Sequence, residues 1–125
     1  IADYTKAIEI NPNYAYAYSN RGVAKNDLKD YKGAIADLNK AIEIDPNDAD
    51  AYFNRGNSKR KLKDYKGAIS DYTKSIEINP NYSEAYYLRG LSKGYLRDKN
   101  TACKDARKAQ ELGYDASELI NIVCK

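Results

Sequence analysis

AYAYSNRG begins at Ala15, ADAYFNRG begins at Ala49 and SEAYYLRG begins at Ser83. These related octapeptides start 34 residues apart each time, so a unit of that length repeats along the chain. A fixed period of this size is typical of arrays in which one unit cannot bury its apolar face alone and stacks on its neighbours. The sequence therefore predicts a row of similar units with a continuous core.

Each unit is expected to contain two helices. The expected first helices span residues 15–27, 49–61 and 83–95, and the expected second helices span residues 31–44, 65–78 and 99–112. Carboxylates can cap the second helices by accepting from free first-turn amides, and the candidates are Asp30, Asp64 and Asp98. Proline disfavours helix in the residue before it, so Pro46 and Pro80 should end the first two second helices. Asn47 and Asn81 are then expected to cap the helices that follow.

The second helices are amphipathic. Their apolar positions recur at helical spacing and share one face, as in Ala34, Ile35, Leu38, Ala41 and Ile42. The same face returns one unit later as Ala68, Ile69, Tyr72, Ser75 and Ile76.

The pattern of small residues and prolines resembles the tetratricopeptide repeat family over nearly the whole chain. The matching positions are Gly22, Gly56 and Gly90; Ala34 with Ala41, Ala68 with Ser75, and Ala102 with Ala109; and Pro12, Pro46 and Pro80. The resemblance implies an all-α, right-handed superhelical solenoid of antiparallel helix hairpins. It divides the chain into a second helix of a truncated unit (1–14), repeats at 15–48, 49–82 and 83–116, and a C-terminal capping helix (117–125). We interpret the chain as a fragment of about three and a half repeats.

The composition excludes several classes of function. The chain has 125 residues, of which 42% are hydrophobic and 31% are charged, so it is too apolar for a disordered tail. No apolar run approaches the roughly 20 residues that span a bilayer. His is absent, which removes the commonest general base and the commonest zinc ligand. We expect no catalytic residue, no cofactor and no metal site, and therefore no enzyme.

A nucleic-acid surface is the weaker reading of the basic residues. Lys59, Arg60, Lys61 and Lys63 lie beside aromatic residues, as some nucleic-acid sites require. The net charge is only +3, and neighbouring acidic residues dilute the basic run. We therefore expect neither nucleic acid nor membrane as a partner.

One stripe of the first helix differs between units that otherwise agree. Its members are the pairs Tyr16/Asp50, Ser19/Phe53, Val23/Asn57, Asn26/Arg60 and Asp27/Lys61. Their spacing places them on one helix face, and the resemblance implies that this face lines a concave peptide-binding groove. The expected groove residues are Tyr16, Ser19, Asn20, Val23, Asn26, Asp27, Asp50, Phe53, Asn54, Asn57, Arg60, Lys61, Glu84, Tyr87, Leu88, Leu91 and Tyr95. Of these, we expect Phe53, Tyr87 and Tyr95 to be exposed aromatic anchors.

The predicted function is a protein–protein interaction scaffold that binds a peptide or helix in this groove. Co-chaperones of the family grip a C-terminal carboxylate with Lys, Asn and Arg side chains, and of that set this chain keeps only Asn54. Glu84 would repel a carboxylate, so we expect a different ligand. The alternative is a self-association module without a separate peptide ligand. It rests on residues 1–10, which lack a first helix and are expected to pack on a second copy, as a possible homodimer, or to fray.

Two sets of side-chain contacts are also expected. An arginine stands in each first helix where the family usually has an apolar residue, and a half-buried arginine needs a carboxylate partner. The expected pairs are Arg21 with Asp37, Arg55 with Asp71, and Arg89 with Asp105. Cys103 and Cys124 are expected to be near neighbours and to remain reduced thiols in the core.

Overall fold

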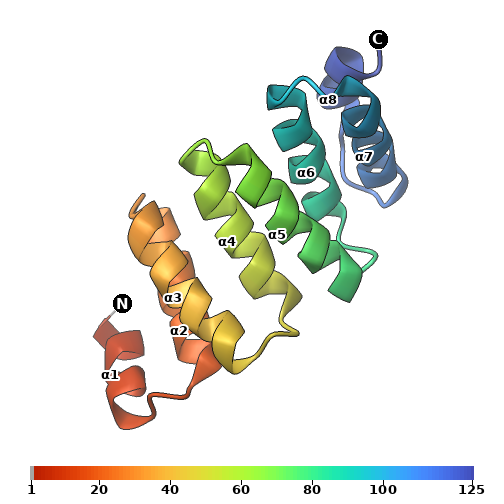
Figure 1. Cartoon of the computed structure of the whole chain (residues 1–125). Coiled ribbons are helices and arrows are strands. Elements are labelled where there is room, and N and C mark those ends of the chain that lie inside the picture. Colours follow the sequence, from red (N-terminus) through yellow and green to blue (C-terminus); the bar gives the residue numbers. More distant parts are fainter. Residues whose placement is uncertain (1) are drawn as a thin grey trace.

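The structure is a computed structural model that describes residues 2–125. The helices in this range are α1 (Ala2–Ile10), α2 (Ala15–Asp27), α3 (Tyr31–Ile44), α4 (Ala49–Lys61), α5 (Tyr65–Ile78), α6 (Ser83–Tyr95), α7 (Lys99–Glu111) and α8 (Ser117–Val123). They follow one another along a single axis from one end of the molecule to the other (Figure 1). The expected all-α solenoid is confirmed, and α7 ends one residue earlier than expected.

The helices pack as three hairpins, α2 with α3, α4 with α5, and α6 with α7, and α3 and α5 also pack on the next first helix. Close approach within a hairpin depends on a missing side chain. A Cβ atom at Gly22 would lie 2.8 Å from Leu38 Cγ, and one at Gly56 would lie 2.8 Å from Tyr72 Cε1. The absence of a side chain at these glycines therefore leaves room in the core for Leu38 and Tyr72 of the second helices.

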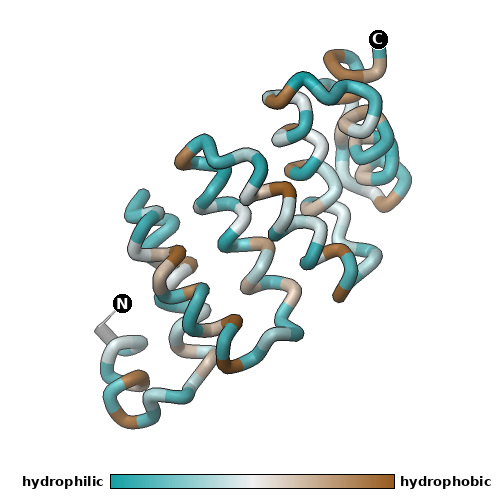
Figure 2. Tube along the Cα trace, viewed as in Figure 1, coloured by the Kyte–Doolittle hydropathy of each residue, from teal (hydrophilic) through white to brown (hydrophobic). Residues whose placement is uncertain are grey.

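Hydrophobic residues are spread through the array in short segments. Figure 2 shows brown hydrophobic positions separated by teal hydrophilic ones along the trace. Among residues 2–125 there is no helix with the length and apolar character needed to cross a membrane.

The aspartate caps of the second helices are confirmed. Asp30 Oδ1 accepts from Gly33 N at 3.0 Å, Asp64 does the same with Gly67 N, and Asp98 Oδ1 accepts from Thr101 N at 3.3 Å. Each carboxylate thus satisfies an amide that has no partner inside its helix.

The expected asparagine caps are wrong. The backbone amide of Asn47 donates to Asp45 Oδ1, and that of Asn81 donates to Asn79 Oδ1, both at 3.2 Å. The residue before each proline therefore forms an Asx turn, and the helix begins further along the chain. Asp48 caps α4 by accepting from Asp50 N and Ala51 N.

The turn inside each hairpin places a long side chain in the left-handed region. Lys29, Lys63 and Arg97 have φ values of 64°, 66° and 65°. This conformation costs an L-residue roughly 1–2 kcal/mol, whereas glycine adopts it freely but loses more entropy on folding.

We expect Lys63→Gly to stabilise the chain by about 0.5 kcal/mol, the difference between those two effects. Urea unfolding would measure the change as a higher transition midpoint. Lys63→Ala removes the same charge but keeps a Cβ, so it should give no gain. Equal gains from both variants would show that charge, rather than backbone conformation, limits stability at this turn.

The expected arginine–aspartate pairs are confirmed in all three units. Arg21 Nε and Nη2 donate to the two carboxylate oxygens of Asp37 at 2.8 and 2.7 Å. Arg55 and Asp71, and Arg89 and Asp105, repeat this bidentate geometry. A lysine one turn on, not expected from the sequence, completes each group: Lys25, Lys59 and Lys93 reach the same carboxylates at 2.9–3.1 Å.

Each arginine also ties its unit to the one before. Arg21 Nη1 donates to Thr5, Arg55 Nη1 to Asn39 and Arg89 Nη1 to Thr73 on the preceding second helix. Burial alone would raise the pKa of Asp37, but the hydrogen bonds from Arg21 and Lys25 outweigh it and hold that pKa below its usual range. The ion pairs thus fix both hairpin geometry and stacking register.

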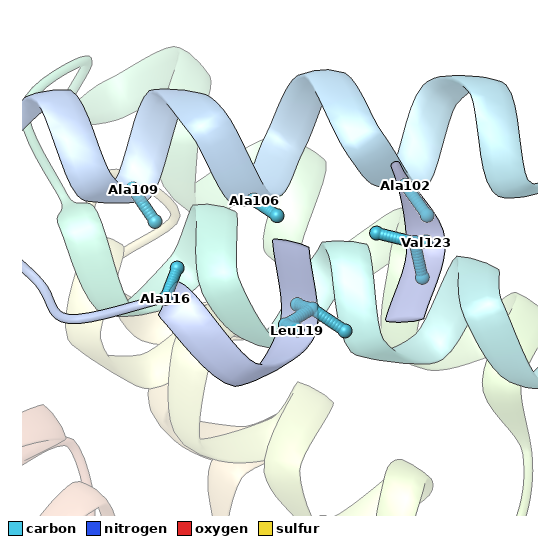
Figure 3. Close-up of a cluster of buried hydrophobic side chains, with 6 residues drawn as sticks. All are labelled: Ala102, Ala106, Ala109, Ala116, Leu119 and Val123. Carbon is cyan, nitrogen blue, oxygen red and sulfur yellow. The ribbon is translucent and has the colours of Figure 1, made fainter. Parts of the chain in front are cut away.

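The last helix packs on α7. Figure 3 shows Ala102, Ala106 and Ala109 of α7 facing Ala116, Leu119 and Val123, and these six residues form one buried cluster. Cys103 and Cys124 are neighbours as expected, with Cα atoms 4.9 Å apart. They form a disulfide, so the expectation of reduced thiols is wrong. The bond joins α7 to the end of α8, whose role as a cap remains a prediction.

The first helix packs against α2. Ile1, part of the expected self-association segment, lies outside the described residues. Ile10 at the other end of α1 is 77% exposed. Pairing of residues 1–10 with a second copy remains a prediction.

Candidate functional site

The candidate site is the face that the first helices α2, α4 and α6 share, called here the first-helix face. The expected groove residues that are exposed are Tyr16, Asp27, Asp50, Lys61, Glu84 and Tyr95. Those that are half-buried are Ser19, Asn20, Val23, Asn26, Asn54, Asn57, Arg60, Tyr87, Leu88 and Leu91. Of the three expected anchors, Tyr95 alone is exposed, at 60%, and its ring is stacked on that of Tyr65.

The expected exposure of Phe53 is wrong, because its side chain is 8% exposed. Its ring stacks on Tyr82 with the centroids 4.7 Å apart and lies tilted against Tyr72 at 5.8 Å. One unit earlier, the positions of Phe53 and Tyr82 are held by Ser19 and Asp48. In the second unit Tyr82 covers the ring of Phe53, so this variable residue is part of the core and not a ligand anchor.

A pocket of about 200 Å³ opens between the first and second units and is called here the first notch. Its lining residues are Val23, Asn26, Asp27, Tyr31, Asn54, Asn57, Arg60 and Lys61. All of these except Tyr31 were among the expected groove residues. The structure therefore brings together the C-terminal halves of α2 and α4 at one concave feature.

Two asparagines in the first notch have internal partners. Asn26 Nδ2 donates to the carbonyl of Asn54 at 3.2 Å, and Asn26 Oδ1 accepts from the buried hydroxyl of Ser58. Asn57 Oδ1 accepts from the hydroxyl of Tyr72 at 2.6 Å. Asn26 thus mainly joins α2 to α4, while Asn57 keeps its amide donors for the notch.

Two of the cations of α4, Arg60 and Lys61, are available to a ligand. Arg60 Nε donates to the Tyr72 hydroxyl at 3.3 Å. Within residues 2–125, neither Arg60 nor Lys61 forms an ion pair within 4 Å. A guanidinium has five N–H donors, so most of the hydrogen-bonding capacity of Arg60 remains for an acceptor that enters the notch. Asp27 stands on the opposite wall, on α2.

A second pocket, of about 240 Å³, lies where α6 and α7 meet α8. It is lined by Leu91, Gly94, Tyr95, Lys99, Leu119, Ile122 and Val123. Ile122 is 64% exposed at its edge. Its lining is mostly apolar and includes the ring of Tyr95, whereas the first notch is lined mainly by polar and charged side chains together with Tyr31 and Val23.

Tyr31 was not among the expected groove residues. A signal for it was present, because this position carries a tyrosine in two units and Lys99 in the third. Being the first residue of a second helix, it fell outside a stripe defined on the first helices. The side chain at a helix start can reach back over the end of the preceding helix, and the stripe did not include it.

No curated protein sequence matches the chain significantly. The crystal structure of MamA matches with a TM-score of 0.92 and 24% identity, covering 96% of this chain and 72% of that one. This likeness shows the fold.

Two further solved structures have slightly higher identity. The first TPR of Spaghetti (RPAP3), bound to the HSP90 peptide SRMEEVD, matches with a TM-score of 0.85 and 25% identity, covering 88% of this chain and 90% of that one. YrrB, described as a TPR protein with an unusual peptide-binding site, matches with a TM-score of 0.82 and 28% identity, covering 88% of this chain and 57% of that one.

Sequence models of one family match overlapping parts of the chain. Tetratricopeptide repeat models match residues 3–36 and 49–82, and a TPR repeat model matches residues 24–61. These segments together include the first two units and all but the first residue of α1, and the helix hairpins have the expected order and packing. The chain belongs to the tetratricopeptide repeat family.

Proposed function

We propose that the chain is a protein-interaction scaffold that binds a peptide or helix along a groove formed by its first helices. The observation that carries this proposal is the first notch, where the half-buried Arg60 and the exposed Lys61 line a pocket and neither is paired with a carboxylate in the part of the chain that the structure describes. Binding sites of this kind combine a shaped pocket with a few polar groups that fix orientation. The peptide-bound relative and the relative with a peptide-binding site support the same general role.

The chemistry does not favour a ligand gripped by its terminal carboxylate. Glu84 and Leu88 stand where the resemblance would place the last lysine and arginine of such a clamp. Glu84 is exposed on the first-helix face, so its charge would repel a terminal carboxylate. The ligand is therefore expected to be an internal segment or a helix.

The test begins with a peptide selected by display on the immobilised chain. Its affinity is then measured for Tyr95→Ala and for a matched control. Tyr95 is 60% exposed on the first-helix face, and truncating such an aromatic anchor should weaken binding by about 1–2 kcal/mol. Leu28→Ala removes an apolar side chain that is 68% exposed outside the expected groove. Equal affinities for Tyr95→Ala and the unmodified chain, across several selected peptides, would argue against a groove.

Self-association remains the second candidate, because Ile10 is exposed at one end of the array. Sedimentation velocity over a micromolar concentration series would detect a dimer. Ile10→Glu should abolish that dimer if residues 1–10 form the contact, since a buried unpaired carboxylate is costly. A monomer at all concentrations would remove this candidate.

A further inference from the structure

The first notch has an equivalent one unit further along, and the protein fills that place with its own side chain. A shift of one repeat relates Tyr31 to Tyr65 and Lys61 to Tyr95. The rings of Tyr65 and Tyr95 stack with centroids 4.7 Å apart and planes 7° apart. In the first notch Lys61 stands where the second ring would be, so the ring of Tyr31 borders the open pocket.

We propose that the first notch binds an aromatic side chain of a peptide ligand, stacked on Tyr31, with an adjacent acidic side chain held by Arg60 and Lys61. This inference rests on the proposed function and names the chemistry of its ligand. The ligand's ring stacks on Tyr31 in the same way that Tyr95 stacks on Tyr65.

Shape and stacking favour a ring over an aliphatic side chain. The pocket of about 200 Å³ is bordered by one half-buried tyrosine and by Val23. Offset-stacked rings attract one another beyond the gain from buried area. The Tyr65–Tyr95 pair shows that this backbone geometry brings two rings to stacking distance.

Charge selects an acidic neighbour for that ring. Arg60 and Lys61 lie on the α4 wall, and the amide of Asn57 adds neutral donors beside them. A carboxylate there would receive charge-assisted hydrogen bonds, which are about twice as strong as neutral ones. Asp27 opposes this on the α2 wall, so the acid is expected on the α4 side of the ring.

The pocket beside α8 differs in a way that makes the assignment specific. It occupies the same place two units on, but Lys99 replaces the tyrosine at the position of Tyr31. No ring stands at that position, and the ring that does line this pocket, that of Tyr95, is already stacked on Tyr65. An aromatic and acidic pair should therefore choose the first notch.

The test uses the acetylated, amidated peptide Gly-Phe-Glu-Gly, titrated to millimolar concentration while amide chemical shifts are followed by NMR. We expect saturable shifts around Tyr31 and in the second half of α4. The peptides Gly-Ala-Glu-Gly and Gly-Phe-Gln-Gly should each bind about tenfold more weakly, which corresponds to the loss of one stacking or charged contact.

Two variants exploit the relation between the units. Lys61→Tyr should rebuild, on Tyr31, the ring pair seen at Tyr65 and Tyr95 and so close the notch. The affinity for the Gly-Phe-Glu-Gly peptide should then fall at least about tenfold. Lys66→Tyr makes the same change at an exposed position outside the notch and should have no effect. Tyr95→Lys should open the neighbouring place and produce new shifts around Tyr65.

The outcomes separate this inference from the proposed function. Unchanged probe binding in Lys61→Tyr, or equal binding of the alanine peptide, overturns the inference. If Lys61→Tyr does not fold, the absence of new shifts in Tyr95→Lys overturns it instead. A display-selected peptide that shifts the first helices but ignores Lys61→Tyr would leave the scaffold function standing and the notch assignment rejected. If neither peptide perturbs the first helices, both are rejected.

Discussion

Arg55→Ala is expected to destabilise the chain by about 3 kcal/mol, because it leaves the buried carboxylate of Asp71 without its bidentate partner. The side chain of Asp71 is only 4% exposed. Lys59 still reaches Asp71 at 3.1 Å, which keeps the cost near the lower end of the range for a broken buried pair. The loss also removes the bond from Arg55 to Asn39, the contact with the preceding unit.

Urea unfolding followed by circular dichroism would measure this effect. The double variant Arg55→Ala with Asp71→Ala is the control, since it removes the stranded charge as well. The double variant should lose less stability than the single one. If Arg55→Ala costs under 0.5 kcal/mol, the size expected of an ordinary surface substitution, the ion pairs do not hold the hairpins together.

Tyr72→Ala is expected to cost about 4 kcal/mol, the typical effect of truncating a buried aromatic residue. Tyr72 is 0% exposed. Its ring packs against Gly56, where a side chain would collide with it, and lies beside the ring of Phe53. Its removal would empty the middle of the second hairpin. The transition midpoint in urea should fall accordingly, with loss of cooperativity between neighbouring units.

Tyr72→Phe separates packing from hydrogen bonding and gives a pH signature. It removes only the hydroxyl that joins Asn57 and Arg60, at a cost of about 1 kcal/mol. Burial raises the pKa of Tyr72 to about 12, above the value of about 10 expected when unfolded. The stability from the neutral hydroxyl is thus complete below pH 10 and is lost as the pH rises toward 12. Tyr72→Phe should flatten that part of the profile; an unchanged slope would show that other groups cause it.

The scaffold was predictable from the sequence because the repeated units can be compared with one another. Residues that pack alike in every unit recur alike, so the helix bounds, the aspartate caps and the Arg–Asp pairs could be read from the period. Lys25, Lys59 and Lys93 repeat with the same period but were missed. A solvated lysine and one that reaches a buried carboxylate look the same in sequence.

The site was harder to predict because it depends on positions that do not repeat. Phe53 was taken as exposed, because its burial depends on stacking against Tyr82, which lies at the far end of the same unit and has no tyrosine counterpart in the unit before. Cys103 and Cys124 could be placed as neighbours, but residue spacing says nothing about oxidation. Tyr31 was missed because it starts a second helix while the stripe was defined on the first helices.

The most direct test of the proposed scaffold is to map a display-selected peptide onto the chain by NMR. Backbone amide shifts are compared between the free and the peptide-saturated chain. The expected result is that the largest changes lie on α2, α4 and α6, with small changes on the outward positions of α3 and α5. Changes confined to α3, α5 and α7, or to α1 alone, would contradict a ligand groove on the first helices.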